Sequence, residues 1–176
     1  MIKNILVTGP PGCGKTTLVR RAVTGLAGLP MTGFYTEEIR GGGDRVGFSL
    51  VALDGRKRTL SHVGIGGPYR VGRYGVDITG FESFLDGIDI RNQGPALVVI
   101  DEIGRMECLS KNFRCMIGEA LDLPVPFLAT IAIRGTPPIE EIKRRTDVKL
   151  ITLSRENRDE KFCEVLGEVS RLTLSR

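Results

Sequence analysis

The stretch ILVTGPPGCGKTTLV, residues 5–19, joins a short apolar run to a helix pattern through a turn rich in glycine and proline. Residues 2–8 are apolar and β-branched and predict a buried strand, whereas residues 16–27 repeat apolar side chains at helical spacing. The turn, GPPGCGKT at 9–16, fits the pattern G-x-x-x-x-G-K-[ST]. A strand, such a loop and a helix in this order predict an α/β fold that binds a phosphate group. An unrelated glycine turn is the alternative.

The residue types in this loop suit a nucleotide. Glycines let the backbone curl so that successive N–H groups face phosphate oxygens, and the helix that follows adds its positive end. Lys15 can reach the β- and γ-phosphates, and the hydroxyl of Thr16 can ligate Mg²⁺. The variable position of the loop, Cys13, is assigned no chemistry. The predicted nucleotide-binding residues are Gly9, Pro10, Pro11, Gly12, Cys13, Gly14, Lys15, Thr16 and Thr17.

A second stretch, ALVVIDEIGRMEC at 96–108, ends a predicted buried strand in two adjacent carboxylates. Asp101 suits the acid that holds Mg²⁺ in P-loop proteins. Glu102 would then project beyond the carboxyl end of the sheet, where it can orient and deprotonate an attacking water. We therefore predict Thr16 and Asp101 as metal residues and Glu102 and Lys15 as catalytic residues. A salt bridge from Glu102 to Arg105 is the alternative.

The rest of the chain alternates strand and helix patterns, which predicts a mainly parallel sheet with helices on both faces. We expect one domain over residues 1–176, with a β-rich, hairpin-like insertion at about 33–75 whose last part, 64–75, is loop. Thr79 and Glu82 form a capping-box pattern for a helix that runs towards Ile90. The predicted strands cover 2–8, 31–36, 45–54, 57–63, 96–101, 126–133 and 148–153; further helices carry 113–121, begin at 136 and close the chain.

The composition narrows the class of protein. Apolar residues make up 41% of the 176 residues, no run is long enough to cross a membrane, and the N-terminus has no secretory pattern, so we expect a cytoplasmic protein. The four cysteines match no zinc spacing, and a single histidine argues against histidine-based triads. The net charge of +4 fits an anionic ligand, nucleic acid or simply a solvated basic face.

Other residues are candidates for completing the site. An arginine could neutralise charge in the transition state; the candidates are Arg40, Arg45, Arg70, Arg73, Arg105, Arg134 and Arg158. Thr130 could sense the γ-phosphate but is better explained as a buried strand residue. Glu37 and Glu38 could face the same crevice or be solvated. Asn157 is expected to cap the last helix, with Glu160 completing a capping box, rather than to contact a base.

Several stretches together resemble the family of small nucleoside-triphosphatases that has members in humans and thermophiles. They are 8–18, GFYTEEIRGGGDRVGF at 33–48, 69–78, VVIDEIGRMEC at 98–108, 139–154 and ENRD at 156–159. The resemblance implies a RecA-like sheet with a hairpin insertion. It also implies slow, Mg²⁺-dependent hydrolysis of ATP, GTP and other nucleoside triphosphates. The family commonly has Val where this chain has Cys13, and often Lys where it has Arg105.

Two other functions stay open at this stage. A small-molecule or nucleotide kinase would share Lys15 and Thr16 and use Glu102 as base towards a substrate hydroxyl, although no arginine-rich lid segment is evident. A nucleotide-switched module that binds RNA or DNA would explain the basic charge, although no aromatic and basic motif supports it. The absence of an N/T-K-x-D motif argues against a switch GTPase and against strict base selectivity. A monomer is the expected state.

Overall fold

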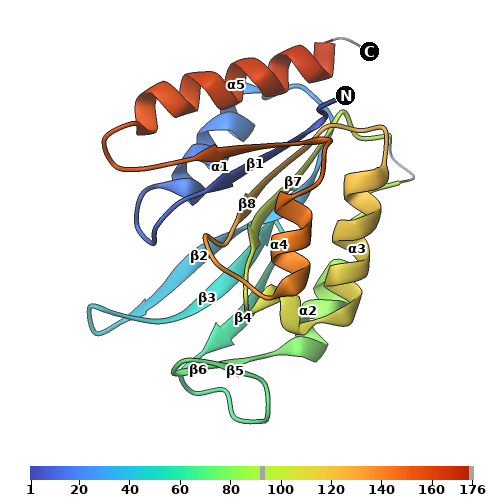
Figure 1. Cartoon of the computed structure of the whole chain (residues 1–176). Helices are drawn as coiled ribbons and strands as arrows, with labels where there is room; N and C mark the ends of the chain where they lie inside the picture. The colour runs from blue at the N-terminus through green and yellow to red at the C-terminus, as the bar shows by residue number, and fades with distance from the viewer. Residues whose placement is uncertain (92–93, 175–176) are drawn as a thin grey trace.

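The computed structural model describes residues 1–91 and 94–174. Within them, one nine-stranded sheet has the order β5-β6-β4-β3-β2-β7-β8-β1-β9 (Figure 1). Its five core strands are parallel to one another; they are β2 (Met31–Gly41), β7 (Leu97–Ile103), β8 (Phe127–Ile131), β1 (Asn4–Thr8) and β9 (Val148–Thr152). The predicted mainly parallel sheet is confirmed. β8 lies between the strand that leads into the glycine loop and the strand that carries the two acids.

The remaining strands extend the sheet in antiparallel fashion; they are β3 (Asp44–Ala52), β4 (Lys57–His62), β5 (Arg70–Val71) and β6 (Tyr74–Val76). This confirms the predicted hairpin insertion. The prediction that 64–75 is all loop is wrong, because β6 pairs with the free edge of β4. The ring of Tyr74 also packs 5.5 Å from that of Phe48. Both contacts are long-range, so the glycine-rich local sequence does not reveal them.

Helices cover both faces of the sheet, as predicted. α1 (Lys15–Gly25) and α5 (Arg158–Leu174) lie together on one face, and α2 (Ile78–Leu85), α3 (Lys111–Asp122) and α4 (Pro137–Lys143) lie on the other (Figure 1). A short 3₁₀ turn, Glu107–Leu109, follows β7. In the part of the chain that the structure describes, two apolar clusters form the core, one for each face. Parallel strands covered on both faces are apolar along their whole length, which is why β1, β7 and β8 read as continuous apolar runs.

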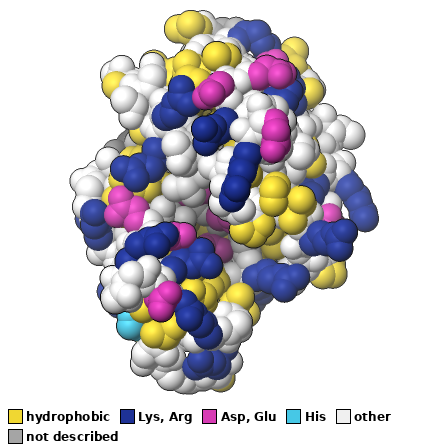
Figure 2. All heavy atoms as spheres, turned by 90° about the vertical axis from the view of Figure 1, so that its left-hand side faces the viewer, with side chains coloured by type: hydrophobic (Ala, Val, Ile, Leu, Met, Phe, Trp, Pro, Cys, Tyr) yellow, Lys and Arg dark blue, Asp and Glu magenta, His cyan; other side chains and the backbone are white. Residues whose placement is uncertain are grey.

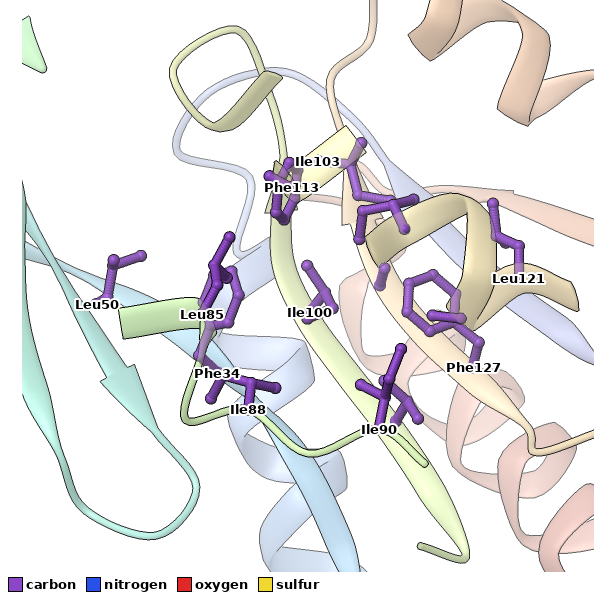
Figure 3. Packing of buried hydrophobic residues seen from close by; sticks show 14 of the residues in the cluster. Phe34, Leu50, Leu85, Ile88, Ile90, Ile100, Ile103, Phe113, Leu121 and Phe127 are labelled. Atoms are coloured by element: carbon purple, nitrogen blue, oxygen red, sulfur yellow. The ribbon is translucent and has the colours of Figure 1, made fainter. Parts of the chain in front are cut away.

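Phe34 packs β2 against the helices α2 and α3. It lies on β2 where the pairing with β7 ends, and it is fully buried. Its ring centroid lies 5.7 Å from that of Phe84 on α2 and 6.3 Å from that of Phe113 on α3. Figure 3 shows Phe34 and Phe113 in one cluster with Ile100 of β7 and Phe127 of β8. The apolar core therefore fixes β2 just before it reaches the predicted active site.

The predicted start of α2 is wrong. The helix begins at Ile78, one residue after Asp77, whose side chain accepts a hydrogen bond from the N–H of Gly80. The helix ends at Leu85 and does not run on to Ile90. The carboxylate of Glu82 does not bond back to a cap; it accepts a hydrogen bond from the buried hydroxyl of Ser110, which itself caps α3. Glu82 thus bonds to the N-cap of α3 and not to the N-terminus of its own helix.

The capping box predicted for α5 is wrong, although Asn157 stands directly before the helix and its carbonyl accepts a hydrogen bond from the N–H of Lys161. The side chain of Asn157 accepts a hydrogen bond from the N–H of Ser154 and donates one to the carbonyl of Thr152. In return, the N–H of Asn157 donates to the hydroxyl of Ser154. This reciprocal pair is the geometry of a capping box shifted into the preceding turn. Glu160 takes no part in it and forms an ion pair with Lys161.

Candidate active site

The glycine loop, residues 9–14, folds back on itself at the carboxyl end of β1. A Cβ on Gly9 would lie 2.3 Å from the carbonyl oxygen of Leu153, so only glycine allows this approach to the end of β9. Gly12 and Gly14 have φ angles of +72° and +105°, a region that side chains disfavour. Gly14 forms the N-terminal cap of α1. The backbone conformation is therefore that of an anion-binding loop in front of a helix N-terminus.

The predicted loop residues fall into two groups. The larger group lines the cleft in front of the loop; it consists of Gly9, Pro11, Gly12, Gly14, Lys15, Thr16 and Thr17. Pro10 and Cys13 do not line it. The carbonyl of Pro10 accepts a hydrogen bond from the N–H of Cys13, which closes the turn, and the Cys13 side chain is buried in the core. Their contribution is to the shape of the loop.

Lys15 lies over the loop. Its Nζ donates to the carbonyl of Gly9 at 3.0 Å and lies 4.0 Å from a carboxylate oxygen of Glu102. The ammonium group is thus held between the loop that would carry the phosphates and the acid that would act on the attacking water. The alternative pairing of Glu102 with Arg105 is not observed among the described residues.

Asp101 is fully buried and is held by three threonines. Its Oδ2 accepts hydrogen bonds from the hydroxyls of Thr16, at 2.7 Å, and Thr36, at 3.2 Å. Its Oδ1 accepts a hydrogen bond from the hydroxyl of Thr130 at 2.5 Å. The donors come from α1, β2 and β8, so three elements converge on one carboxylate. Thr130 was predicted to be a buried strand residue, and it is one. Its hydroxyl holds the Asp101 carboxylate.

These oxygen atoms fit the hard cation that the fold implies. Mg²⁺ prefers oxygen ligands and keeps several waters when it also binds substrate phosphates. The Thr16 hydroxyl and the Asp101 carboxylate lie within hydrogen-bond distance of each other, beside the phosphate loop. Thr16 could therefore ligate the ion directly, while Asp101 holds one of its waters.

Glu102 follows Asp101 through a cis peptide bond and is half-buried, with its side chain lining the cleft. Burial raises the pKa of this carboxyl above its usual value; the nearby Lys15 opposes the shift and Asp101 adds to it. A desolvated carboxylate close to the reacting phosphate is a suitable general base. The structure thus brings together the phosphate loop, the buried acid and the predicted base.

The cleft has a volume of about 810 Å³, within the range of a site that binds a molecule of nucleotide size. Figure 2 faces this edge of the molecule and shows Lys and Arg side chains around a hollow with acidic side chains inside it. Of the predicted arginines, Arg45 and Arg134 line the cleft. Arg20 also lines it and was missed, because its position on α1 gave no signal beyond that of a surface residue.

The other predicted arginines lie outside this cleft. Arg70 and Arg73 donate to backbone carbonyls of the antiparallel extension and do not line the cleft. Arg40 pairs with Glu38. Arg105 lines a neighbouring cavity, and Arg158 begins α5.

Glu37 and Glu38 line the cleft, which was the first of the two alternatives for these residues; the other was exposure to solvent. Both are neutralised by neighbours: Glu37 pairs with Arg20 at 3.7 Å and with Lys57 at 3.2 Å. Glu38 pairs with Arg45 at 3.0 Å and with Arg40. Hydrogen bonds from Arg45 and Arg40 outweigh burial and lower the pKa of Glu38. These carboxylates therefore hold arginines at the rim of the cleft.

The sequence did not predict the positions of two residues near the site, Thr36 and Glu107. Thr36 was quoted only as part of a strand, yet it binds Asp101 through its hydroxyl. Glu107 is almost fully buried beside Glu102, and burial, with a contribution from Glu102, raises its pKa to about 8. The register of β2 against β7 could have placed Thr36 level with the acids, but no local signal marks Glu107 as buried.

The loop, the buried acid and the intervening strand β8 define a P-loop NTPase fold. A family model described as NTPase matches residues 4–166, and the chain belongs to this family. It is 42% identical to the human cancer-related nucleoside-triphosphatase, over 90% of this chain and 92% of that protein. It is 39% identical to the nucleoside-triphosphatase THEP1 of Thermotoga sp. strain RQ2, over 93% of each chain.

Solved structures agree with this assignment. The crystal structure of THEP1 from the hyperthermophile Aquifex aeolicus superposes with a TM-score of 0.86 at 37% identity, over 94% of this chain and 98% of that one. The solution structure of the human cancer-related nucleoside triphosphatase gives a TM-score of 0.79 at 40% identity, over 95% and 97% of the two chains. None of the helices in the described residues has the length and apolar character needed to cross a membrane.

Proposed function

We propose that this chain is a Mg²⁺-dependent nucleoside-triphosphatase that converts ATP, GTP and other nucleoside triphosphates to the diphosphate and phosphate. The observation that carries the proposal is the position of Glu102. It directly follows the buried Asp101, lines the cleft and lies 4.0 Å from the ammonium of Lys15. The names of the relatives, all nucleoside-triphosphatases, support the same reaction.

The chain's own residues have distinct tasks in this reaction. Backbone N–H groups of residues 11–16 bind the phosphates, and Lys15 neutralises charge on the β- and γ-phosphate oxygens. Thr16 and Asp101 would hold Mg²⁺, which when bound would offset the negative charge that develops on the leaving diphosphate. Glu102 accepts a proton from the water that attacks the γ-phosphorus, as the bond to the bridging oxygen breaks.

Base tolerance and slow turnover belong to the same proposal. The sequence has no N/T-K-x-D motif for reading a guanine base. Arg20 and Arg45, two of the three arginines that line the cleft, are paired with Glu37 and Glu38 and so are not free to neutralise the γ-phosphate. A missing arginine in the transition state costs about 10³–10⁵ in rate. We expect turnover far below hundreds per second, and a measured kcat in that range would contradict this part of the proposal.

The test is phosphate release from ATP, GTP, CTP and UTP with Mg²⁺, for the wild-type chain and for Glu102→Gln. We expect all four to be cleaved by the wild type. The variant should bind nucleotide with similar affinity and turn over about 10²–10⁴-fold more slowly, because it lacks the base. Glu141→Gln, an exposed carboxylate on α4 outside the cleft, is the matched control. No release by the wild type, or full activity in Glu102→Gln, would refute the proposal.

A further inference from the structure

A second cavity, which we term the side pocket, adjoins the cleft beyond Glu102. It has a volume of about 270 Å³. Thr36, Phe48, Glu102, Ala132 and Arg134 line both cavities, whereas Val71, Arg105, Met106 and Glu107 line the side pocket and not the cleft. The cleft is large enough for a nucleotide, and the side pocket suits a smaller molecule. Glu102 is therefore shared by two adjoining sites of different size.

The walls of the side pocket combine positive charge with apolar surface. Arg105 and Arg134 form no ion pair with any residue in 1–91 or 94–174. This contrasts with Arg20 and Arg45, which are paired with Glu37 and Glu38 at the rim of the cleft. Phe48, Val71, Met106 and Ala132 supply the apolar wall. Guanidinium groups without partners bind carboxylate or phosphate groups in two-pronged fashion, so the pocket suits a small organic anion.

Glu107 lines the side pocket next to Glu102. A Cβ placed on Gly104 would lie 2.8 Å from Oε2 of Glu107 and 3.1 Å from Oε1 of Glu102, so the two carboxyl groups flank this glycine. Burial raises the pKa of Glu107 to about 8. Burial thus favours the uncharged form of this group, which does not repel an anion. The ionisable groups around the side pocket are thus Glu102, Glu107, Arg105 and Arg134.

We propose that the side pocket binds a small organic alcohol that carries an anionic group, and that this alcohol accepts the γ-phosphate in place of water. This rests on the proposed function, because it uses the same phosphate loop and the same base. Arg105 holds the anionic group, and Arg134, which lines both cavities, lies at the boundary across which the phosphoryl group passes. Glu102 faces the hydroxyl.

The transfer step balances without any further reactant. The hydroxyl oxygen forms a bond to the γ-phosphorus as the bond from that phosphorus to the bridging oxygen breaks. The electron pair of the broken bond stays on the nucleoside diphosphate, and the hydroxyl proton passes to the carboxylate of Glu102. The products are the diphosphate and a phosphate ester. Hydrolysis is then the reaction of the same site when water occupies the acceptor position.

The experiment measures nucleoside diphosphate and inorganic phosphate in parallel, with ATP, Mg²⁺ and one of three probes at about 10 mM. Glycerol 3-phosphate and 3-hydroxybutyrate are anionic alcohols, and glycerol is their uncharged counterpart. Hydrolysis yields the two products in a ratio of one, whereas transfer raises the ratio above one and gives a new ester signal in ³¹P NMR. We expect the ratio to rise with at least one anionic probe and to stay near one with glycerol.

Two variants connect the effect to the side pocket. Arg105→Gln should lower the excess of diphosphate about tenfold or more, since a charge-assisted contact is lost. Val71→Phe should abolish the excess by filling the pocket. Both should keep the hydrolysis measured without a probe, because neither side chain lines the cleft. Arg70→Gln, which lines neither cavity, is the matched control.

The outcomes separate the two proposals. A ratio of one with every probe would overturn the acceptor site, because about 10 mM fills a pocket even at millimolar affinity; hydrolysis without a probe would still stand. An excess of diphosphate that persists in both Arg105→Gln and Val71→Phe would also overturn it. Diphosphate formed only when a probe is present would support the acceptor site and refute the simple hydrolase. No diphosphate under any condition would refute both.

Discussion

Replacing Thr130 by Val tests how strongly the buried acid depends on its supports. Valine keeps the shape of the strand residue and removes only the hydroxyl that donates to Oδ1 of Asp101 at 2.5 Å. Both residues are fully buried, so no water can take over this bond. A hydrogen bond to a carboxylate contributes about 1.5–3 kcal/mol, and we expect a loss of roughly 2 kcal/mol in the free energy of unfolding. Thr16 and Thr36 keep their bonds to Oδ2.

The same change should weaken the binding of Mg²⁺, because the Asp101 carboxylate loses the hydroxyl that sets its orientation. Removal of a group that supports a metal ligand costs about 10–100-fold in metal affinity or activity, so we expect the Mg²⁺ concentration for half-maximal activity to rise about tenfold. Urea unfolding and a Mg²⁺ titration measure the two effects, with Thr130→Ser as the control that keeps the hydroxyl. Wild-type stability and Mg²⁺ dependence in Thr130→Val would refute the reasoning.

Two predictions concern stability away from the site. Ser110→Ala removes the N-cap of α3 and the bond to Glu82, and should cost about 1–2 kcal/mol in urea unfolding; a change below about 0.3 kcal/mol would contradict the role of this link. Hydrogen bonding from Arg145 holds the pKa of Asp147 below its usual 3.8, so the stabilisation is present above that pH and is lost as the pH falls through the lowered value. Asp147→Asn should therefore lower the Tm at pH 7 and converge with the wild type in strong acid; an equal gap at every pH would exclude this ion pair as the cause.

The sequence predicts features whose causes are local. The strand before the glycine loop, the helix after it and the stripe Phe113, Ile117 and Leu121 depend on the order of residues within one element. The role expected for Asp101 could be stated because a strand end beside a phosphate loop is a recurrent arrangement. Its position against Thr16 agrees with that role.

Features that depend on contacts between distant segments could not be predicted. Glu82 matches a capping box in sequence, but its partner in the structure is Ser110, the N-cap of another helix. Thr36 reaches Asp101 only because β2 lies beside β7 in a particular register. The burial of Glu107 depends on how the 3₁₀ turn after β7 packs, and its sequence alone describes an ordinary exposed acid.

The double pairing of β2 limits how far this protein can be shortened. Its first residues bond to β7, its later residues bond to β3, and Thr36 lies just past the change of partner. A version trimmed of β3 to β6 would expose β2 as an unpaired edge and remove Leu50, Leu60 and Val76 from the core cluster that contains Phe34. Such an edge promotes association with other chains. The antiparallel extension therefore cannot be deleted without harm, and a minimal catalytic core of this fold has to include it.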